Sequence, residues 1–103
     1  MMILYQVNVT VKSDTINEWR EWMCAYHIPE VMHTGYFHQV RMLESNDESN
    51  NGIFIIEYIC ESEEKLHQYR KEVSPSLQRS HNEKFGDKVT SFRNEFSIVL
   101  ELP

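Results

Sequence analysis

Residues 36–60 read YFHQVRMLES, NDESNNG and IFIIEYIC, and this stretch decides the fold. Its first and last segments are rich in β-branched and aromatic residues, which favour β-strands. The segment between them is polar and consists mostly of turn-forming residues. We therefore predict a hairpin of two antiparallel strands, and a loop centred near Ser49 places Arg41 opposite Glu57.

On the N-terminal side of the hairpin, residues 2–12 alternate apolar and polar side chains, which predicts a half-buried strand. A helix should follow, because Thr15-x-x-Glu18 fits a capping box and apolar residues then recur every three to four positions. Pro29 should end or bend this helix, since proline lacks a backbone N–H and crowds the preceding turn. Gly35 is the expected stop.

On the C-terminal side, Ser62 is a suitable N-cap for a second helix, which Ser74-Pro75 should interrupt. Residues 88–102 alternate again and predict the last strand. The element order is then β-α-β-β-α-β, the split pattern of a ferredoxin-like α+β domain. We expect residues 1–103 to form one such domain, built on an antiparallel four-stranded sheet.

Both faces of the predicted sheet carry apolar residues. We expect the helices to cover the face formed by Tyr5, Val7, Val9, Phe54, Ile56, Tyr58, Phe92, Phe96 and Ile98. The other face mixes aliphatic residues with Arg41, Glu57 and Arg93, and an exposed patch of that kind marks an interface. We therefore expect a homodimer through this sheet face, with these three polar residues enclosed between the two sheets. The competing interpretation is a monomer with scattered apolar residues on its surface.

Composition and charge argue against several classes of function. The chain of 103 residues has 16 acidic and 10 basic residues, a net charge of -6, which argues against binding nucleic acid or an anionic membrane. The sequence shows no signal peptide and no apolar run of the roughly 18–20 residues that cross a bilayer, so we expect a cytoplasmic protein. Cys24 and Cys60 form no CxxC pair, and we expect reduced, packed thiols.

Several short motifs together resemble a small bacterial family described as a domain of unknown function, over nearly the whole chain. The motifs are Trp19-Arg20-Glu21-Trp22-Met23, His27-Ile28-Pro29-Glu30-Val31, Thr34-Gly35-Tyr36-Phe37, Cys60-Glu61-Ser62, and Ser74-Pro75-Ser76-Leu77 followed by His81 and Phe85-Gly86-Asp87. The segment from His27 to Val31 is also similar to the EthD-type branch of the dimeric α/β barrels. The resemblance implies two ferredoxin-like subunits joined sheet to sheet. Relatives of that fold include cofactor-free monooxygenases, haem-degrading enzymes and isomerases of small ring compounds, but fold alone assigns no reaction.

His27 is the first candidate for a catalytic acid or base. It lies where Pro29 breaks the first helix, and an imidazole exchanges a proton near neutral pH. The alternative is a structural histidine that bonds a carbonyl freed by Pro29.

The candidate lining of an aromatic ligand pocket is Tyr5, Trp22, Tyr58 and His81. For His81 the alternative is a hydrogen-bonded core histidine, and we interpret Trp19 as core.

We expect no metal and no organic cofactor. His27-x-x-Glu30-x-x-His33 has the spacing of metal ligands, but Pro29 breaks the helix that would align them. The sequence also lacks HExxH, paired CxxC and Gly-rich phosphate motifs.

Our leading interpretation is a protein that binds a small aromatic ligand, with monooxygenase or isomerase-like chemistry that needs no cofactor. The alternatives are a non-catalytic homodimeric interaction module and, on the resemblance alone, a haem-binding protein that uses His81 or His27.

Overall fold

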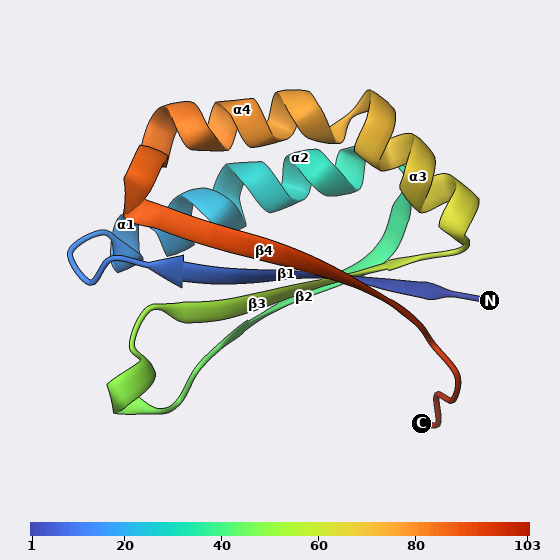
Figure 1. The fold of residues 1–103 in the computed structure, drawn as a ribbon, viewed down its shortest axis with the longest axis horizontal. Helices are drawn as coiled ribbons and strands as arrows, with labels where there is room; N and C mark the ends of the chain where they lie inside the picture. The colour runs from blue at the N-terminus through green and yellow to red at the C-terminus, as the bar shows by residue number, and fades with distance from the viewer.

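One antiparallel sheet carries a layer of helices on one of its faces (Figure 1). The structure is a computed structural model that describes residues 1–103, apart from the side chain of Asn50. In chain order the elements are β1 (Ile3–Val11), α1 (Ile16–Trp22), a π-helical turn (Met23–His27), α2 (Ile28–His33), β2 (Phe37–Glu44), a 3-10 turn (Glu48–Asn50), β3 (Ile53–Cys60), α3 (Glu63–Glu72), α4 (Ser74–Phe85), a 3-10 turn (Gly86–Lys88) and β4 (Val89–Ser97). The predicted ferredoxin-like α+β order is confirmed.

The strands lie in the order β2-β3-β1-β4, and neighbours are antiparallel. In the hairpin of β2 and β3, Arg41 pairs with Glu57, so the predicted register is confirmed. Their side chains also form an ion pair, with Nε of Arg41 2.5 Å from Oε1 of Glu57. The four strands therefore form one continuous sheet in which β1 and β3 are central and β2 and β4 are the edges.

The first helical segment passes through Pro29 without ending there. A π-helical turn precedes α2, and in it the backbone N–H of Ile28 donates to the carbonyl of Met23, five residues back. Pro29 then lies in the first turn of α2, where a missing N–H breaks no helical hydrogen bond. The helix ends at His33, just before Gly35, whose φ of 81° suits a residue without a side chain. The expected interruption is thus a local change of helix type.

The two predicted helix caps have different outcomes. Ser62 caps α3 as predicted, since its hydroxyl accepts from the N–H of Lys65 at 3.2 Å. The capping box at Thr15 is wrong, because Thr15 makes no cap bond and its hydroxyl donates to Asp14 instead. The reason is its backbone, at φ -112° and ψ -8°, which lies away from the extended conformation of a side-chain N-cap.

The predicted orientation of β4 is also wrong. Phe92 lies opposite Asn8 on the open face of the sheet and is 64% exposed, and Phe96 is on the same face and 49% exposed. Arg93 lies opposite the buried Val7 and therefore faces the helices. A shift of one residue in a strand moves every side chain to the other face, and the apolar alternation of β4 matches the open face.

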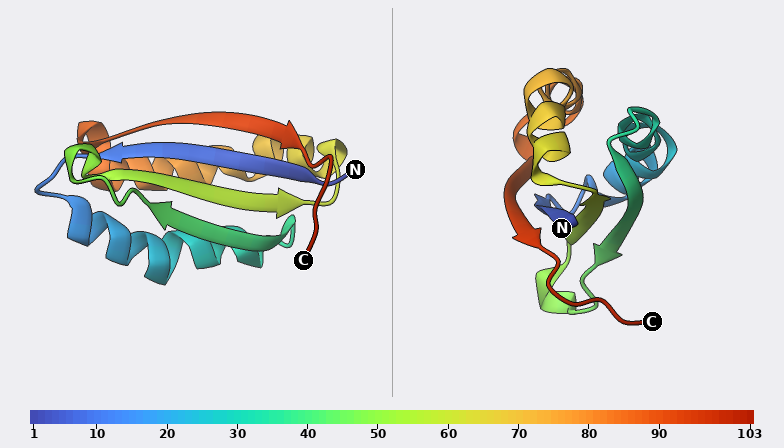
Figure 2. Two further views of the ribbon diagram at one scale, coloured as in Figure 1. Left: turned by 90° about the horizontal axis from the view of Figure 1, so that it is seen from below. Right: turned by 90° about the vertical axis from the view of Figure 1, so that its right-hand side faces the viewer.

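The helices all lie on one side of the sheet, and no helix of the described chain covers its other face (Figure 2). The strand β4 ends at Ser97, earlier than predicted, and Ile98 lies with the residues of this open face instead of under the helices. The large apolar side chains exposed on β2, on β4 and on the segment after β4 are Leu43, Phe92, Phe96, Val99, Leu100 and Leu102. This arrangement keeps the predicted apolar open face but gives it two phenylalanines in place of Arg93.

Both cysteines are free, but only Cys60 is buried. Cys24 is exposed on the π-helical turn, so the prediction of a packed thiol is wrong there. Among the described residues, no helix has the length and apolarity to span a membrane.

Candidate functional site

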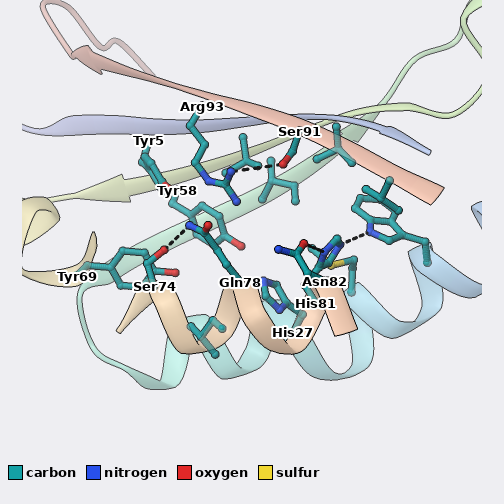
Figure 3. A pocket seen from close by; sticks show the side chains of 17 residues that line it. Tyr5, His27, Tyr58, Tyr69, Ser74, Gln78, His81, Asn82, Ser91 and Arg93 are labelled. Atoms are coloured by element: carbon teal, nitrogen blue, oxygen red, sulfur yellow. Dashed lines mark hydrogen bonds between the residues drawn. The ribbon is translucent and has the colours of Figure 1, made fainter. Parts of the chain in front are cut away.

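A cavity of about 140 Å³ lies between the sheet and the helices (Figure 3). Its apolar wall consists of Val7, Val9, Trp19, Met23, Ile56, Leu77 and Val89. Its polar wall consists of Tyr5, His27, Tyr58, Tyr69, Ser74, Gln78, His81, Asn82, Ser91 and Arg93. An apolar cavity on which a few polar groups converge is the usual form of a small-molecule site.

Three polar atoms around this cavity are buried and have no hydrogen-bond partner among the described residues. They are Oη of Tyr5, Nδ1 of His27 and Nε of Arg93. A buried polar group left unpaired costs about 1–3 kcal/mol, so native structures rarely leave several together. The cavity is therefore suited to a ligand or water that completes these hydrogen bonds.

His27 lies at the C-terminal end of the π-helical turn, on the wall of the cavity. The ring of Trp22 stacks on it, with ring centroids 5.4 Å apart. Burial, together with the neighbouring His81 and Arg93, lowers the pKa of His27 to about 4. At neutral pH the ring is thus uncharged and carries a lone pair that can accept a proton.

His81, on α4, has both ring nitrogens occupied. The indole Nε1 of Trp19 donates to Nε2 of His81 at 2.9 Å, and Nδ1 lies 3.5 Å from Oδ1 of Asn82. These partners fit the neutral tautomer with its proton on Nδ1. Burial lowers the pKa of His81, against an opposing effect of the Asn82 bond. Of the two histidines, whose ring centroids are 5.8 Å apart, only His27 has a buried ring nitrogen without a partner.

Three tyrosines close the opposite end of the cavity. The ring of Tyr5 contacts the other two, with centroids 6.2 Å from that of Tyr58 and also 6.2 Å from that of Tyr69. Burial raises the pKa of Tyr58 far above its usual value and the pKa of Tyr69 to about 12. These two hydroxyls therefore stay protonated at neutral pH and can donate hydrogen bonds.

Arg93 supplies the formal positive charge of the cavity wall. Its guanidinium donates a long hydrogen bond of 3.4 Å from Nη1 to Oγ of Ser91. None of the ion pairs between described residues includes Arg93. Glu95, the next residue of β4 on the same face, pairs with Arg70 instead. The cavity thus holds a half-buried cation without a carboxylate partner.

Most of the predicted site residues meet at this cavity. Tyr5, Tyr58, His27 and His81 all line it. Trp22 does not line it and packs behind it, against the rings of His27, His81 and Phe85. Arg41 and Glu57 lie on the open face, as predicted, while Arg93 does not and belongs to the cavity.

Several members of the wall were not predicted from the sequence. Trp19 is fully buried, in keeping with its interpretation as core, but it also lines the cavity and holds His81. Gln78 and Asn82 lie one turn of helix apart on α4, beside the stripe of Leu77 and His81. Their spacing next to that stripe is the one signal in the sequence that could have identified them.

The structure gives no support to the haem alternative. The cavity has a volume of about 140 Å³, close to the roughly 150 Å³ of a cavity that holds one benzene molecule. A haem is far larger than benzene and does not fit in this volume. Nε2 of His81 is already occupied by Trp19. No group of three or more His, Cys, Asp or Glu side chains within the described part of the chain is placed to hold a metal ion. The residues present therefore do not fit haem.

The sheet order and the cavity between sheet and helices define a small α+β protein of the ferredoxin-like class. The chain belongs to the family "Domain of unknown function (DUF4286)", whose sequence pattern it matches over residues 2–99. The resemblance drawn from the sequence motifs is therefore confirmed. No curated protein matches the sequence.

Solved structures of several proteins share this fold. A variant of SnoaB, a cofactor-independent oxygenase from Streptomyces nogalater, is 15% identical and superposes with a TM-score of 0.77, covering 99% of this chain and 97% of that chain. An ethyl tert-butyl ether d (ethd) family protein from Bacillus halodurans is 13% identical, with a TM-score of 0.70 and coverage of 94% and 100%. A dimeric ferredoxin-like protein from an uncultured marine organism is 5% identical, with a TM-score of 0.71 and coverage of 98% and 97%. At these identities the likeness shows the fold alone.

Proposed function

We propose that this protein binds a small molecule with a single ring in the cavity and catalyses a proton transfer on it, without a metal or organic cofactor. The observation that carries the proposal is the pair of unpartnered buried atoms, Nδ1 of His27 and Oη of Tyr5, on the wall of one cavity. A ligand with a polar group toward each end would satisfy both atoms and fill the apolar part of the cavity.

The size of the cavity sets the size of the ligand. Pockets for drug-sized ligands start at about 300 Å³, whereas this cavity has about 140 Å³. That volume suits one six-membered ring, because a benzene molecule occupies a cavity of about 150 Å³. The expected aromatic-lined pocket thus takes a smaller ligand than a typical pocket would.

His27 is the residue we assign to the proton transfer. Its neutral ring accepts a proton from an acidic C–H or O–H of the ligand, while a tyrosine hydroxyl orients the substrate. Such a step begins an isomerisation, in which the proton returns at another atom. The same step also begins an oxygenation in which O₂ is the oxidant. We include oxygenation in the proposal because a cofactor-independent oxygenase has the same fold.

The proposal is tested by exchange of carbon-bound hydrogen. Cyclohexanone and its carboxylate-bearing counterpart, oxocyclohexanecarboxylate, are incubated with the protein in D₂O, and loss of the signals next to the ketone is followed by proton NMR. General base catalysis contributes about 10²–10⁴-fold, so we expect His27→Gln to lose most of the exchange above buffer. His33→Gln, which removes an exposed histidine of α2, is the matched control. Exchange that His27→Gln leaves unchanged would refute the role of His27.

We also propose that a second copy of the chain covers the open face of the sheet. The exposed Phe92 and Phe96 lie there on β4, and the exposed Leu43 lies on β2 at the other edge of the same face, in a row with Ile55 and Asn8. Monomers rarely expose a large apolar patch. The dimeric ferredoxin-like protein of the same fold supports this arrangement. Native mass spectrometry tests it, since a homodimer appears at twice the monomer mass.

The same open face supports the second candidate function, a non-catalytic homodimeric interaction module. In that case the cavity would bind nothing, and both histidines would serve packing alone. The exchange experiment and native mass spectrometry together separate the two functions. A dimer that neither binds one-ring probes nor exchanges their protons supports the interaction module.

A further inference from the structure

Arg93 projects from the middle of β4 into the space between the sheet and the helices (Figure 3). Its strand partner is the buried Val7, so its aliphatic part lies along the apolar wall of the cavity. Nη1 reaches Ser91 at 3.4 Å, and Nε is buried without a partner. Nη1 therefore makes only a long hydrogen bond, and Nε makes none.

Glu95, two residues from Arg93 on the same face of β4, is already used by another arginine. Glu95 pairs with Arg70, and Glu57 pairs with Arg41 on the opposite face of the sheet. A charge that is half-buried without a counter-ion is unfavourable unless a ligand or water compensates it. The position of Arg93 is thus explained if the occupant of the cavity supplies the missing negative charge.

The other titratable groups of the wall leave this single charge uncompensated. His27 and His81 are held neutral by burial, and Tyr58 and Tyr69 stay protonated. The cavity therefore carries one positive charge, although the whole chain has a net charge of -6. A ligand with one negative charge would neutralise the cavity, whereas a phosphate with two charges would leave an excess.

We infer that the ligand of this cavity is a one-ring carboxylate, bound through its carboxylate to the guanidinium of Arg93. The planar guanidinium presents paired N–H donors that match the two oxygens of a carboxylate. The ring of the ligand then lies against the apolar wall formed by Val7, Ile56 and Leu77. This inference rests on the proposed function, because it names the class of molecule that the same cavity binds.

Benzoate and benzamide are the probes that test the inference, since they have nearly the same shape and differ in charge. Both are titrated into the full chain at pH 7.5, and dissociation constants are read from protein NMR shifts. We expect benzoate to bind about tenfold more tightly than benzamide, in line with a hydrogen bond to a charged group. Arg93→Gln should remove this preference, and Arg93→Lys should keep only part of it. Arg79→Gln, which removes an exposed arginine of α4, should leave the preference intact.

The outcomes separate this inference from the proposed function. If benzamide binds the wild-type protein as tightly as benzoate, the cavity binds one-ring molecules and the inference of a carboxylate is overturned. The inference is also overturned if benzoate is preferred but Arg93→Gln keeps the preference. If neither probe binds at millimolar concentration, the proposed function itself fails, and the inference fails with it.

Discussion

The indole of Trp19 donates a hydrogen bond to Nε2 of His81 at 2.9 Å, across 62 positions of the sequence. This bond joins the first helix to the last one at the wall of the cavity. It also fixes which ring nitrogen of His81 carries the proton, because Nε2 can accept only when it is unprotonated. The neutral state of His81 is thus maintained by packing and by a specific donor.

Removing that donor should make His81 easier to protonate. Trp19→Phe keeps an aromatic ring in the core but leaves Nε2 of His81 without its partner. We expect the pKa of His81 to rise toward its usual value and the free energy of unfolding to fall by about 1–2 kcal/mol. An NMR titration of the histidine rings and urea unfolding measure the two effects.

The matched variant for this prediction is Trp22→Phe. Trp22 contacts both histidines through its ring, with centroids 5.4 Å from His27 and 5.9 Å from His81. Since this contact survives in phenylalanine, the pKa of His81 should change little. A rise of the His81 pKa of equal size in Trp22→Phe and in Trp19→Phe would contradict the role given to the hydrogen bond.

The stability of the protein should depend on the protonation of His27. Its pKa is about 4 in the folded protein and 6.5 in the unfolded chain, so the unfolded state binds more protons between these values. The contribution to stability is complete above pH 6.5 and is lost as the pH falls toward 4. The full effect is about 3 kcal/mol, and a series of urea unfolding curves between these pH values would measure it. His27→Gln should flatten this pH dependence, whereas His33→Gln should leave it unchanged.

Binding of benzoate should raise the pKa of His27. Arg93 is one of the groups that lower this pKa, and a bound carboxylate would neutralise its charge. Arg93→Gln should raise the pKa of His27 in the free protein and abolish any further change on addition of benzoate. Ring signals of His27, followed by NMR with and without benzoate, check both statements. A His27 pKa that is identical in the two conditions would show that the carboxylate does not reach Arg93.

Phe92 should control self-association without affecting the fold of the subunit. It is 64% exposed on the open face, so Phe92→Glu removes no buried contact within one subunit. A charge that becomes buried in a dimer interface is strongly unfavourable, and we expect the variant to be monomeric by analytical ultracentrifugation. Tyr26→Glu is the control, because Tyr26 is 66% exposed on the helical side. A Phe92→Glu variant that remains dimeric would place the interface elsewhere.

The hairpin register was predictable, whereas the facing of β4 was not. The hairpin loop, residues 45–52, is polar throughout and marks where the chain turns, so its centre sets which residues of β2 and β3 pair, and Arg41 faces Glu57 as predicted. The strand β4 gives no such signal, because its apolar alternation fits either a core face or an exposed apolar face. The prediction consequently placed Arg93 on the wrong side of the sheet. The positive charge that Arg93 gives to the cavity was therefore not predicted either.

The candidate site was predictable in part. Aromatic residues and His27 at the helix break indicated a pocket, and both are found at the cavity. The role of Trp19 could not be predicted, because a residue on the inner stripe of a helix can contact either the core or a cavity. Unpartnered atoms such as Oη of Tyr5 emerge only when elements distant in sequence are brought together.

The π-helical turn makes the length of the first helical segment a determinant of the site. Such a turn corresponds to one residue inserted into a regular α-helix, and each residue of an α-helix adds about 100° of rotation. Deletion of Ala25 would restore regular winding through residues 23–27 and change how Met23 and His27, the two ends of the turn, are placed relative to each other on the cavity wall. Insertions and deletions within residues 23–27 are thus expected to disturb this site more than most substitutions on its exposed surface.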